Sequence, residues 1–299
     1  MTVLPADAEP ETAAEVVVRP MREDDVPGAQ QVADVAMREA GTRYGWVVPD
    51  LDDAGRVRAQ ARHAHLLATD PDGCWVAETA GRVVGVALSL VRESLWFLSL
   101  LAVDREVQAQ GVGARLLGAT LRTAEGLPAA MIMSSSDPKA LRRYARAGFA
   151  LLPGYEATGP VDRTVLPVTP QVRDGDWDAD GERVDDLGRR LRGAAYGPDL
   201  PHLRDRGARL LVADDGFAVL RDGDLSLLGA GDPATAQALL WAALAEATGD
   251  VEVGPLTAAQ QWAVEVVLEA RLSLRPGTSM CTRGAVGPLS PYVPNGAFG

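Results

Sequence analysis

The chain has 299 residues, of which 47% are apolar, and a formal net charge of -12 at pH 7. This length predicts two domains, and the apolar content can supply both cores. The acidic balance argues against a nucleic-acid partner, and no run of about 18 apolar residues could cross a bilayer. Cys74 and Cys281 lie far apart in the sequence, so we expect neither a disulfide framework nor a zinc site, and a cytoplasmic protein.

Residues 1–15 are acidic and rich in Ala and Pro, without the features of a signal peptide, and predict a disordered tail. Residues 16–19 then predict a strand, and helices are predicted over 26–36 and 52–68. His63 and His65 in the second helix are two residues apart and therefore on different faces, so they predict no metal pair. Lysine, isoleucine and asparagine occur once each, which indicates a GC-rich bacterial genome.

Three strands, at 74–78, 83–91 and 95–103, alternate with turn signals and predict an antiparallel meander. The third strand runs into a loop with Gly111 and Gly113, which opens a helix predicted over 111–124. Glycine has no side chain that would keep a ligand away from the backbone, and the free N–H groups of a helix start attract anions. The loop therefore predicts a seat for a pyrophosphate.

A strand at 129–133 leads to a further helix. Asp137 suits its N-cap, Pro138 its first position and Gly148 the residue after its end.

These two segments carry a resemblance to a known family. The spacing Gln108-x-x-Gly111-x-Gly113-Ala114 resembles the acyl-CoA loop of the GNAT N-acetyltransferase superfamily. Residues 137–149 resemble the superfamily segment Asn-x-x-Ala-x-x-Leu-Tyr-x-x-x-Gly-Phe, with matches at Ala140, Tyr144, Gly148 and Phe149. Asp137 and Arg143 depart from that segment.

The resemblance implies an α+β fold over residues 16–160, with a mixed, mostly antiparallel central sheet flanked by helices. It implies acetyl-CoA as co-substrate and no metal. The backbone of the loop would bind the pyrophosphate and the edge of the preceding strand the pantetheine. The residues implied in donor binding are Leu101, Ala102, Val103, Gln108, Ala109, Gln110, Gly111, Val112, Gly113, Ala114, Asp137 and Tyr144.

The resemblance also implies two catalytic roles. The Leu101 N–H is the candidate donor to the oxyanion, and Tyr144 is the candidate acid for the departing thiolate. A tyrosine that merely packs on the sheet is the alternative for Tyr144.

No general base is evident from the motifs. Many family members carry a glutamate where this chain has Phe97. Ser99, on the same face of the strand, could begin a water chain, and Glu93 and Glu78 are the other candidates. Each of the three fits a surface or hairpin position as well.

The acceptor is expected at the loop over residues 39–46. Glu39 could hold an ammonium group while Tyr44 and Trp46 wall the pocket, which suits a cationic amine. The same aromatics suit packing of the loop on the core.

Residues 170–299 repeat the strand and helix pattern without the loop, because Ala234 and Ala236 stand where Gly111 and Gly113 stood. We interpret this half as a degenerate GNAT-like domain that acts as a wall, a homodimer surface or a lid; an unrelated α+β domain is the alternative. The tail at 291–299 predicts a strand end or a segment across the domain junction, although disorder fits it too.

The sequence therefore predicts tandem domains and an N-acetyltransferase. It would transfer acetyl from acetyl-CoA to a primary amine of a small molecule or protein, by direct attack in a ternary complex. Neither cysteine lies in a motif, so no covalent enzyme intermediate is expected. The alternatives are an inactive acyl-CoA sensor and a partner-binding module.

Overall fold

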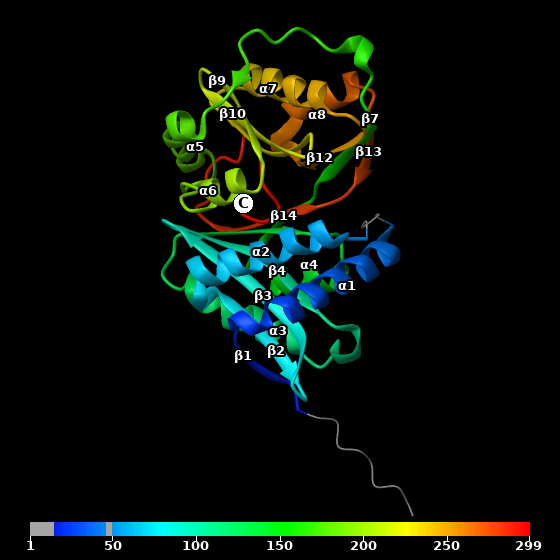
Figure 1. Ribbon diagram of the computed structural model, residues 1–299, viewed down its shortest axis with the longest axis vertical. Helices are drawn as coiled ribbons and strands as arrows, with labels where there is room; N and C mark the ends of the chain where they lie inside the picture. The colour runs from blue at the N-terminus through cyan, green and yellow to red at the C-terminus, as the bar shows by residue number, and fades with distance from the viewer. Residues whose placement is uncertain (1–14, 46–49) are drawn as a thin grey trace, which may run out of the picture.

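The computed structural model describes residues 15–45 and 50–299. They form two lobes, which lie one above the other in Figure 1, with the C-terminus between them. The predicted tail falls almost entirely outside the described residues. A seven-stranded sheet with the order β1-β2-β3-β4-β5-β14-β6 organises the first lobe. Its strands are β1 (Val17–Pro20), β2 (Cys74–Thr79), β3 (Arg82–Arg92), β4 (Leu95–Val103), β5 (Ala129–Ser134), β6 (Ala150–Leu152) and β14 (Ser279–Gly284).

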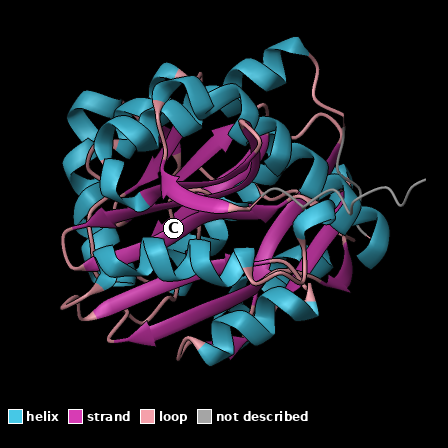
Figure 2. Cartoon of the chain, turned by 90° about the horizontal axis from the view of Figure 1, so that it is seen from below, coloured by secondary structure: helices cyan, strands magenta, loops and turns pink. Residues whose placement is uncertain are grey.

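Helices cover both faces of this sheet, as the view from below also shows (Figure 2). Side chains of α1 and α2 pack on one face with Val76, Val86 and Leu88. Side chains of α3 pack on the other face with Ala77 and Ala87. The helices of this lobe are α1 (Val26–Tyr44), α2 (Asp53–Thr69), α3 (Val112–Thr120) and α4 (Pro138–Arg146).

The second lobe repeats the strand order of the first in two separate sheets, β15-β11-β10-β9-β8 and β12-β7-β13. Its strands are β7 (Tyr155–Pro160), β8 (Arg173–Asp174), β9 (Arg209–Ala213), β10 (Gly216–Arg221), β11 (Asp224–Ala230), β12 (Asp250–Leu256), β13 (Ser273–Pro276) and β15 (Tyr292–Val293). Its helices are α5 (Trp177–Arg192), α6 (Asp199–Asp205), α7 (Pro233–Glu246) and α8 (Gln261–Glu269). The predicted α+β fold class is confirmed.

The two halves of the chain exchange one strand each. β14, from the end of the chain, lies between β5 and β6, pairing Cys281 with Ile132 and with Leu151. β7, from the first half, lies between β12 and β13, and Ala157 belongs to the core of the second lobe. The stretch at 160–170 therefore separates the halves in the sequence, while two strands cross it in space.

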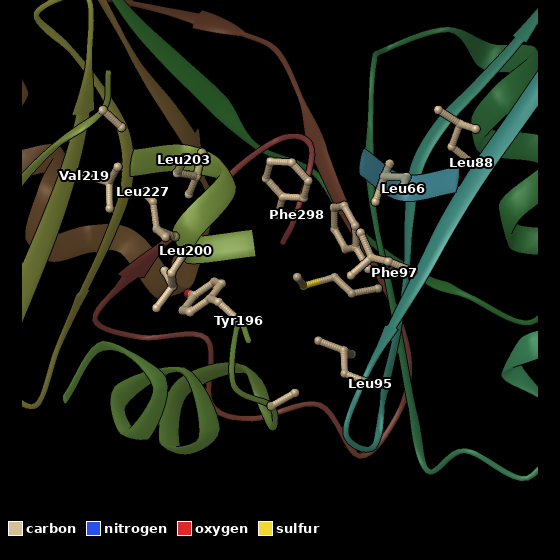
Figure 3. Packing of buried hydrophobic residues seen from close by; sticks show 14 of the residues in the cluster. Leu66, Leu88, Leu95, Phe97, Tyr196, Leu200, Leu203, Val219, Leu227 and Phe298 are labelled. Atoms are coloured by element: carbon tan, nitrogen blue, oxygen red, sulfur yellow. The ribbon is translucent and has the colours of Figure 1, made fainter. Parts of the chain in front are cut away.

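The hydrophobic core is continuous between the lobes. Leu95 and Phe97 of β4 face Tyr196, Leu200 and Phe298, so the second lobe covers a part of the first sheet (Figure 3). Phe298 is 3% exposed, and β15 pairs with β11. The end of the chain is therefore ordered, a strand end followed by a segment across the junction.

A buried ion-pair network joins the lobes. Arg92 of β3 donates to both oxygens of Asp199 at 2.7 Å and pairs with Asp70 at 2.8 Å. His65 Nε2 also lies 2.8 Å from Asp199. Burial would raise the pKa of Asp199, but hydrogen bonds from His65 and Arg92 bring it below its usual value.

We expect a chain that ends at residue 160 to fail to fold. It lacks β14, so the facing edges of β5 and β6 lose their hydrogen-bond partner, and unpaired edges favour aggregation. Circular dichroism and gel filtration measure the outcome, and co-expression of residues 161–299 should restore a soluble complex. A monomeric fragment that unfolds cooperatively would contradict the dependence on strand exchange.

Replacing Arg92→Leu should cost about 3–5 kcal/mol at neutral pH, because Asp199 would be buried without its cation. The Asp199 pKa is lowered in the folded state, so this contribution exists above the unfolded pKa of about 3.9 and disappears as pH falls through the folded value. Urea unfolding at pH 7 and pH ~3.5 should therefore show a gap that narrows in acid. The control is Arg82→Leu, whose exposed pairs with Asp104 and Glu106 should contribute under about 1 kcal/mol.

Candidate active site

A cavity of about 1510 Å³ lies where the lobes meet and is lined by both. The first lobe contributes the end of α1, the second half of β4, the loop before α3, and α4. The second lobe contributes residues of β7 and β10–β13, and the tail contributes residues 294–297. The glycine loop, Tyr144 and the second lobe thus share one space.

Strand β4 changes its pairing halfway along. Its register with β3 shifts so that Leu98 pairs with Ser89 and Leu100 with Leu88, which leaves Ser99 as a bulge. Its parallel pairing with β5 covers only Leu95 to Leu98. Beyond that point the two strands separate, and Leu101 to Val103 line the cavity without a β5 partner. This free strand edge can pair with amide groups of a ligand.

The loop between β4 and α3 is held open by its backbone. Gly111 is the N-cap of α3 with a φ of 77°, a left-handed conformation that favours glycine, and no side chain caps this helix start. Nothing lies within 4 Å of where a Gly111 Cβ would stand. Gln108 fixes the position of the loop, because its Nε2 donates to the Val103 carbonyl and its Oε1 accepts from Lys139.

Gly113 lies close to a side chain of another helix. A Cβ at this position would lie 2.9 Å from the guanidinium carbon of Arg143, so the space beside Gly113 holds a side chain of α4. Gly113 also lines the cavity, and the contact of its backbone with a ligand stays a prediction. Arg143 places a cation beside the start of α3, where an anion would also gain from the helix dipole.

The corresponding helix start in the second lobe is closed. Asp232, the N-cap of α7, accepts hydrogen bonds from the backbone N–H groups of Ala234 and Thr235. Hydrogen bonds from Thr235 and Ala234 lower the pKa of Asp232, so its carboxylate is charged. The Asp232 carboxylate therefore occupies the anion position at the start of α7, whereas the corresponding position at the start of α3 has no side-chain cap.

Helix α4 brings Tyr144 and Asp137 to the cavity. The Asp137 carboxylate caps the helix by accepting from the Lys139 N–H, and it also accepts from the Tyr44 hydroxyl at 2.8 Å. Tyr144 is 5% exposed, and burial raises the pKa of its phenol. Among the described residues its hydroxyl has no hydrogen-bond partner. It is a protonated donor in the cavity wall.

The structure separates the candidate bases. Ser99 lines the cavity, and its Oγ is buried without a partner among the described residues. Glu93 does not line the cavity: it lies at the β3–β4 hairpin tip, pairs with Arg189 and accepts from the Ala195 N–H. The hypothesis that Glu93 is catalytic is therefore wrong. Glu78 of β2 pairs with Arg19 of β1 and does not line the cavity.

Of the acceptor candidates, Glu39 and Tyr44 line the cavity, and Trp46 lies outside the described residues. Sequence reasoning missed the charged side chains that line the cavity from α2 and the second lobe. They are Arg62, Glu156, Arg221, Glu252 and Arg275. No motif in the sequence marks them, because only the packing of the lobes brings them together.

Residues 55–157 match the family model for an acetyltransferase (GNAT) domain. Over these residues the chain is similar to GNAT acetyltransferases. No curated protein matches the sequence. No group of three or more potential metal ligands occurs in the part of the chain that the structure describes, nor does any helix there have the length and hydrophobicity to span a membrane.

Several solved structures share the fold over nearly the whole chain. A Pyrococcus horikoshii protein described as an acetyltransferase is 18% identical, with a TM-score of 0.76 over 98% of this chain and 99% of its own. A GCN5-related N-acetyltransferase from Sphaerobacter thermophilus is 12% identical, with a TM-score of 0.57 over 90% of this chain and 95% of its own. A GCN5-related N-acetyltransferase from Kribbella flavida is 16% identical, with a TM-score of 0.54 over 93% and 73%. The two-lobed fold is thus shared with GNAT structures.

Replacing Gly111→Val should weaken acetyl-CoA binding at least tenfold. A β-branched residue is strained at positive φ, so the loop would shift and redirect the N–H groups at the start of α3. Calorimetry with acetyl-CoA measures the change. Gly181→Ala in α5 is the matched control, because nothing lies near its Cβ position and its φ is ordinary. Unchanged affinity in Gly111→Val would contradict a role of this loop in donor binding.

Proposed function

We propose that the chain transfers an acetyl group from acetyl-CoA to a primary amine, of a small molecule or a protein, by direct attack in a ternary complex. The observation that carries the proposal is the separation of β4 from β5 beside an uncapped helix start, in the cavity that Tyr144 lines. The separated strands offer a free backbone edge, and the helix start offers free N–H groups. An elongated donor with amides and a pyrophosphate fits both.

Most of the residues that would hold the donor line the cavity. Backbone N–H groups between Gln108 and Ala114 would bind the pyrophosphate, with Arg143 adding charge. The edge of β4 from Leu101 to Val103 would pair with the pantetheine amides. Asp137 would act indirectly, by capping α4 and holding Tyr44. Acetyl-CoA supplies the activated thioester.

Two groups then serve the transfer itself. The Leu101 N–H, on the strand edge freed from β5, would stabilise the negative charge that develops on the acetyl carbonyl oxygen. The Tyr144 hydroxyl would donate its proton, or a hydrogen bond, to the departing thiolate. Because burial raises its pKa, Tyr144 stays protonated through neutral pH and is available as a donor.

The amine must lose a proton before it attacks. Ser99 would begin a water relay for this proton, because the residue lines the cavity at the bulge of β4 and its buried Oγ has no partner among the described residues. A β-bulge redirects side chains, which gives the serine its place between the separating strands. Solvent takes the proton at the end of the relay.

The test combines binding and turnover on the full chain. Calorimetry should detect acetyl-CoA binding, and thiol release with a panel of amines should detect transfer. Tyr144→Phe should lower kcat about tenfold to a hundredfold while acetyl-CoA binding is unchanged, because only leaving-group protonation is lost. Tyr155→Phe is the control, since Tyr155 is 51% exposed and does not line the cavity.

Three results would decide against parts of this proposal. An absence of acetyl-CoA binding would overturn it. Binding without thiol release for any amine would instead support an acyl-CoA sensor. Full activity in Tyr144→Phe would remove the proton-donor role from Tyr144.

A further inference from the structure

Two arginines from different lobes line the same cavity. Arg62 lies on α2 of the first lobe, and Arg221 lies at the end of β10 in the second. They are close enough for the charge of Arg221 to act on Arg62: burial, and then Arg221, lower the pKa of Arg62 to about 10. The packing of the lobes thus brings two like charges to one cavity, with Arg62 half-buried and Arg221 exposed.

Neither guanidinium forms an ion pair with a described residue. Among the described residues no hydrogen bond or ion pair involves the side chain of Arg62 or Arg221, and the buried Arg62 Nε has no partner. Arg275 in the same cavity differs, because it pairs with Glu156 and Glu252 at 2.8 and 2.7 Å. Burial raises the pKa of Asp224 and the charge of Arg221 opposes that rise, but no Asp224 oxygen lies within 4.0 Å of an Arg221 nitrogen, so the two form no ion pair. Asp224 does not line the cavity.

An arrangement of this kind destabilises the protein by itself. Arg62 is half-buried and its Nε is fully buried, so its charge is costly without a partner, and the like charge of the exposed Arg221 adds to that cost. The planar guanidinium fork matches the oxygens of carboxylate and phosphate groups, and two forks on one anion make charge-assisted hydrogen bonds. An anion bound between Arg62 and Arg221 would relieve both penalties.

Asn295, which lines the same cavity, is already satisfied. Asn295 donates to the Ser226 carbonyl and hydroxyl, and its oxygen accepts from the N–H groups of Ala297 and Phe298. Elsewhere in the cavity Glu156 and Glu252 share the single cation Arg275, which leaves an excess negative charge. The cavity therefore has a cationic part and an anionic part, as a zwitterionic ligand requires.

We propose that the acceptor is an amine that also carries an anionic group, a carboxylate or a phosphate monoester, and that Arg62 and Arg221 bind this group together. This inference rests on the proposed acetyltransferase function and narrows its acceptor. The amine would reach the acetyl group while its anionic end is held between the two lobes.

Matched acceptors test the proposal on the full chain. Thiol release is measured with lysine against cadaverine, ornithine against putrescine, and O-phosphoethanolamine against ethanolamine, which differ by the anionic group. We expect the anionic member of a pair to have the lower KM. Which pair shows the difference distinguishes a carboxylate from a phosphate. Equal or better use of the amines without the anionic group would overturn the proposal.

Variants test the residues. Arg62→Met and Arg221→Gln should raise KM for the anionic acceptor about tenfold to a hundredfold, with kcat, acetyl-CoA affinity and KM for the uncharged partner little changed. Arg58→Gln is the control, because Arg58 is an exposed arginine of α2 that does not line the cavity. Unchanged KM in both variants would overturn the assignment.

Two further readouts separate this inference from the proposed function. Arg62→Met should raise the unfolding temperature, because it removes an unpartnered cation, whereas a purely structural arginine would lower it. Inorganic phosphate should bind the wild type but not the double variant in calorimetry without acetyl-CoA. Absence of phosphate binding together with normal acetyl-CoA binding would count against the anion site alone. Absence of acetyl-CoA binding would count against the proposed function.

Discussion

The exchange of strands between the two halves of the chain is the constraint on which the rest of the structure depends. β14 pairs with β5 along all of Ala129 to Ser134, whereas β4 pairs with β5 only as far as Leu98. β5 is thus held on its far side by a strand from the end of the chain, and β4 is held by β3. The opening between β4 and β5 follows, because each strand is fixed by its other neighbour. The opening beside β4 therefore needs a strand from the second half.

The same exchange explains why the lobes behave as walls of one cavity. β7 and β14 cross between the lobes in opposite directions, and the core around Phe97 and Phe298 fills the space beside them (Figure 3). The Arg92–Asp199 pair adds a directional contact, because a buried carboxylate held by a guanidinium tolerates little displacement. Arg62 and Arg221 can be kept close despite their like charge only because these contacts hold the lobes together.

Local features could be predicted from the sequence, and long-range ones could not. Gly111, Asp137 and Tyr144 lie within short segments whose caps, turns and spacing follow from neighbouring residues, and the helices they border occur where expected. The contact of Gly113 with Arg143 could not be predicted, because Arg143 lies thirty positions further on and in another helix. Glu93 was misjudged because its partners Arg189 and Ala195 belong to the second half. The strand exchange and the proximity of Arg62 to Arg221 leave no local pattern in the sequence.

The two helix starts that follow β4 and β11 differ in what caps them. At α3 the N-cap is Gly111, which has no side chain to offer, so the first N–H groups of the helix are free to bind an external anion. At α7 the N-cap is Asp232, and its carboxylate already accepts from two of those N–H groups. An internal carboxylate is present at an effective concentration that no free ligand reaches, so α7 cannot compete for a pyrophosphate. The start of α7 is thereby closed to an external anion, while strands of the second lobe contribute charged side chains to the cavity.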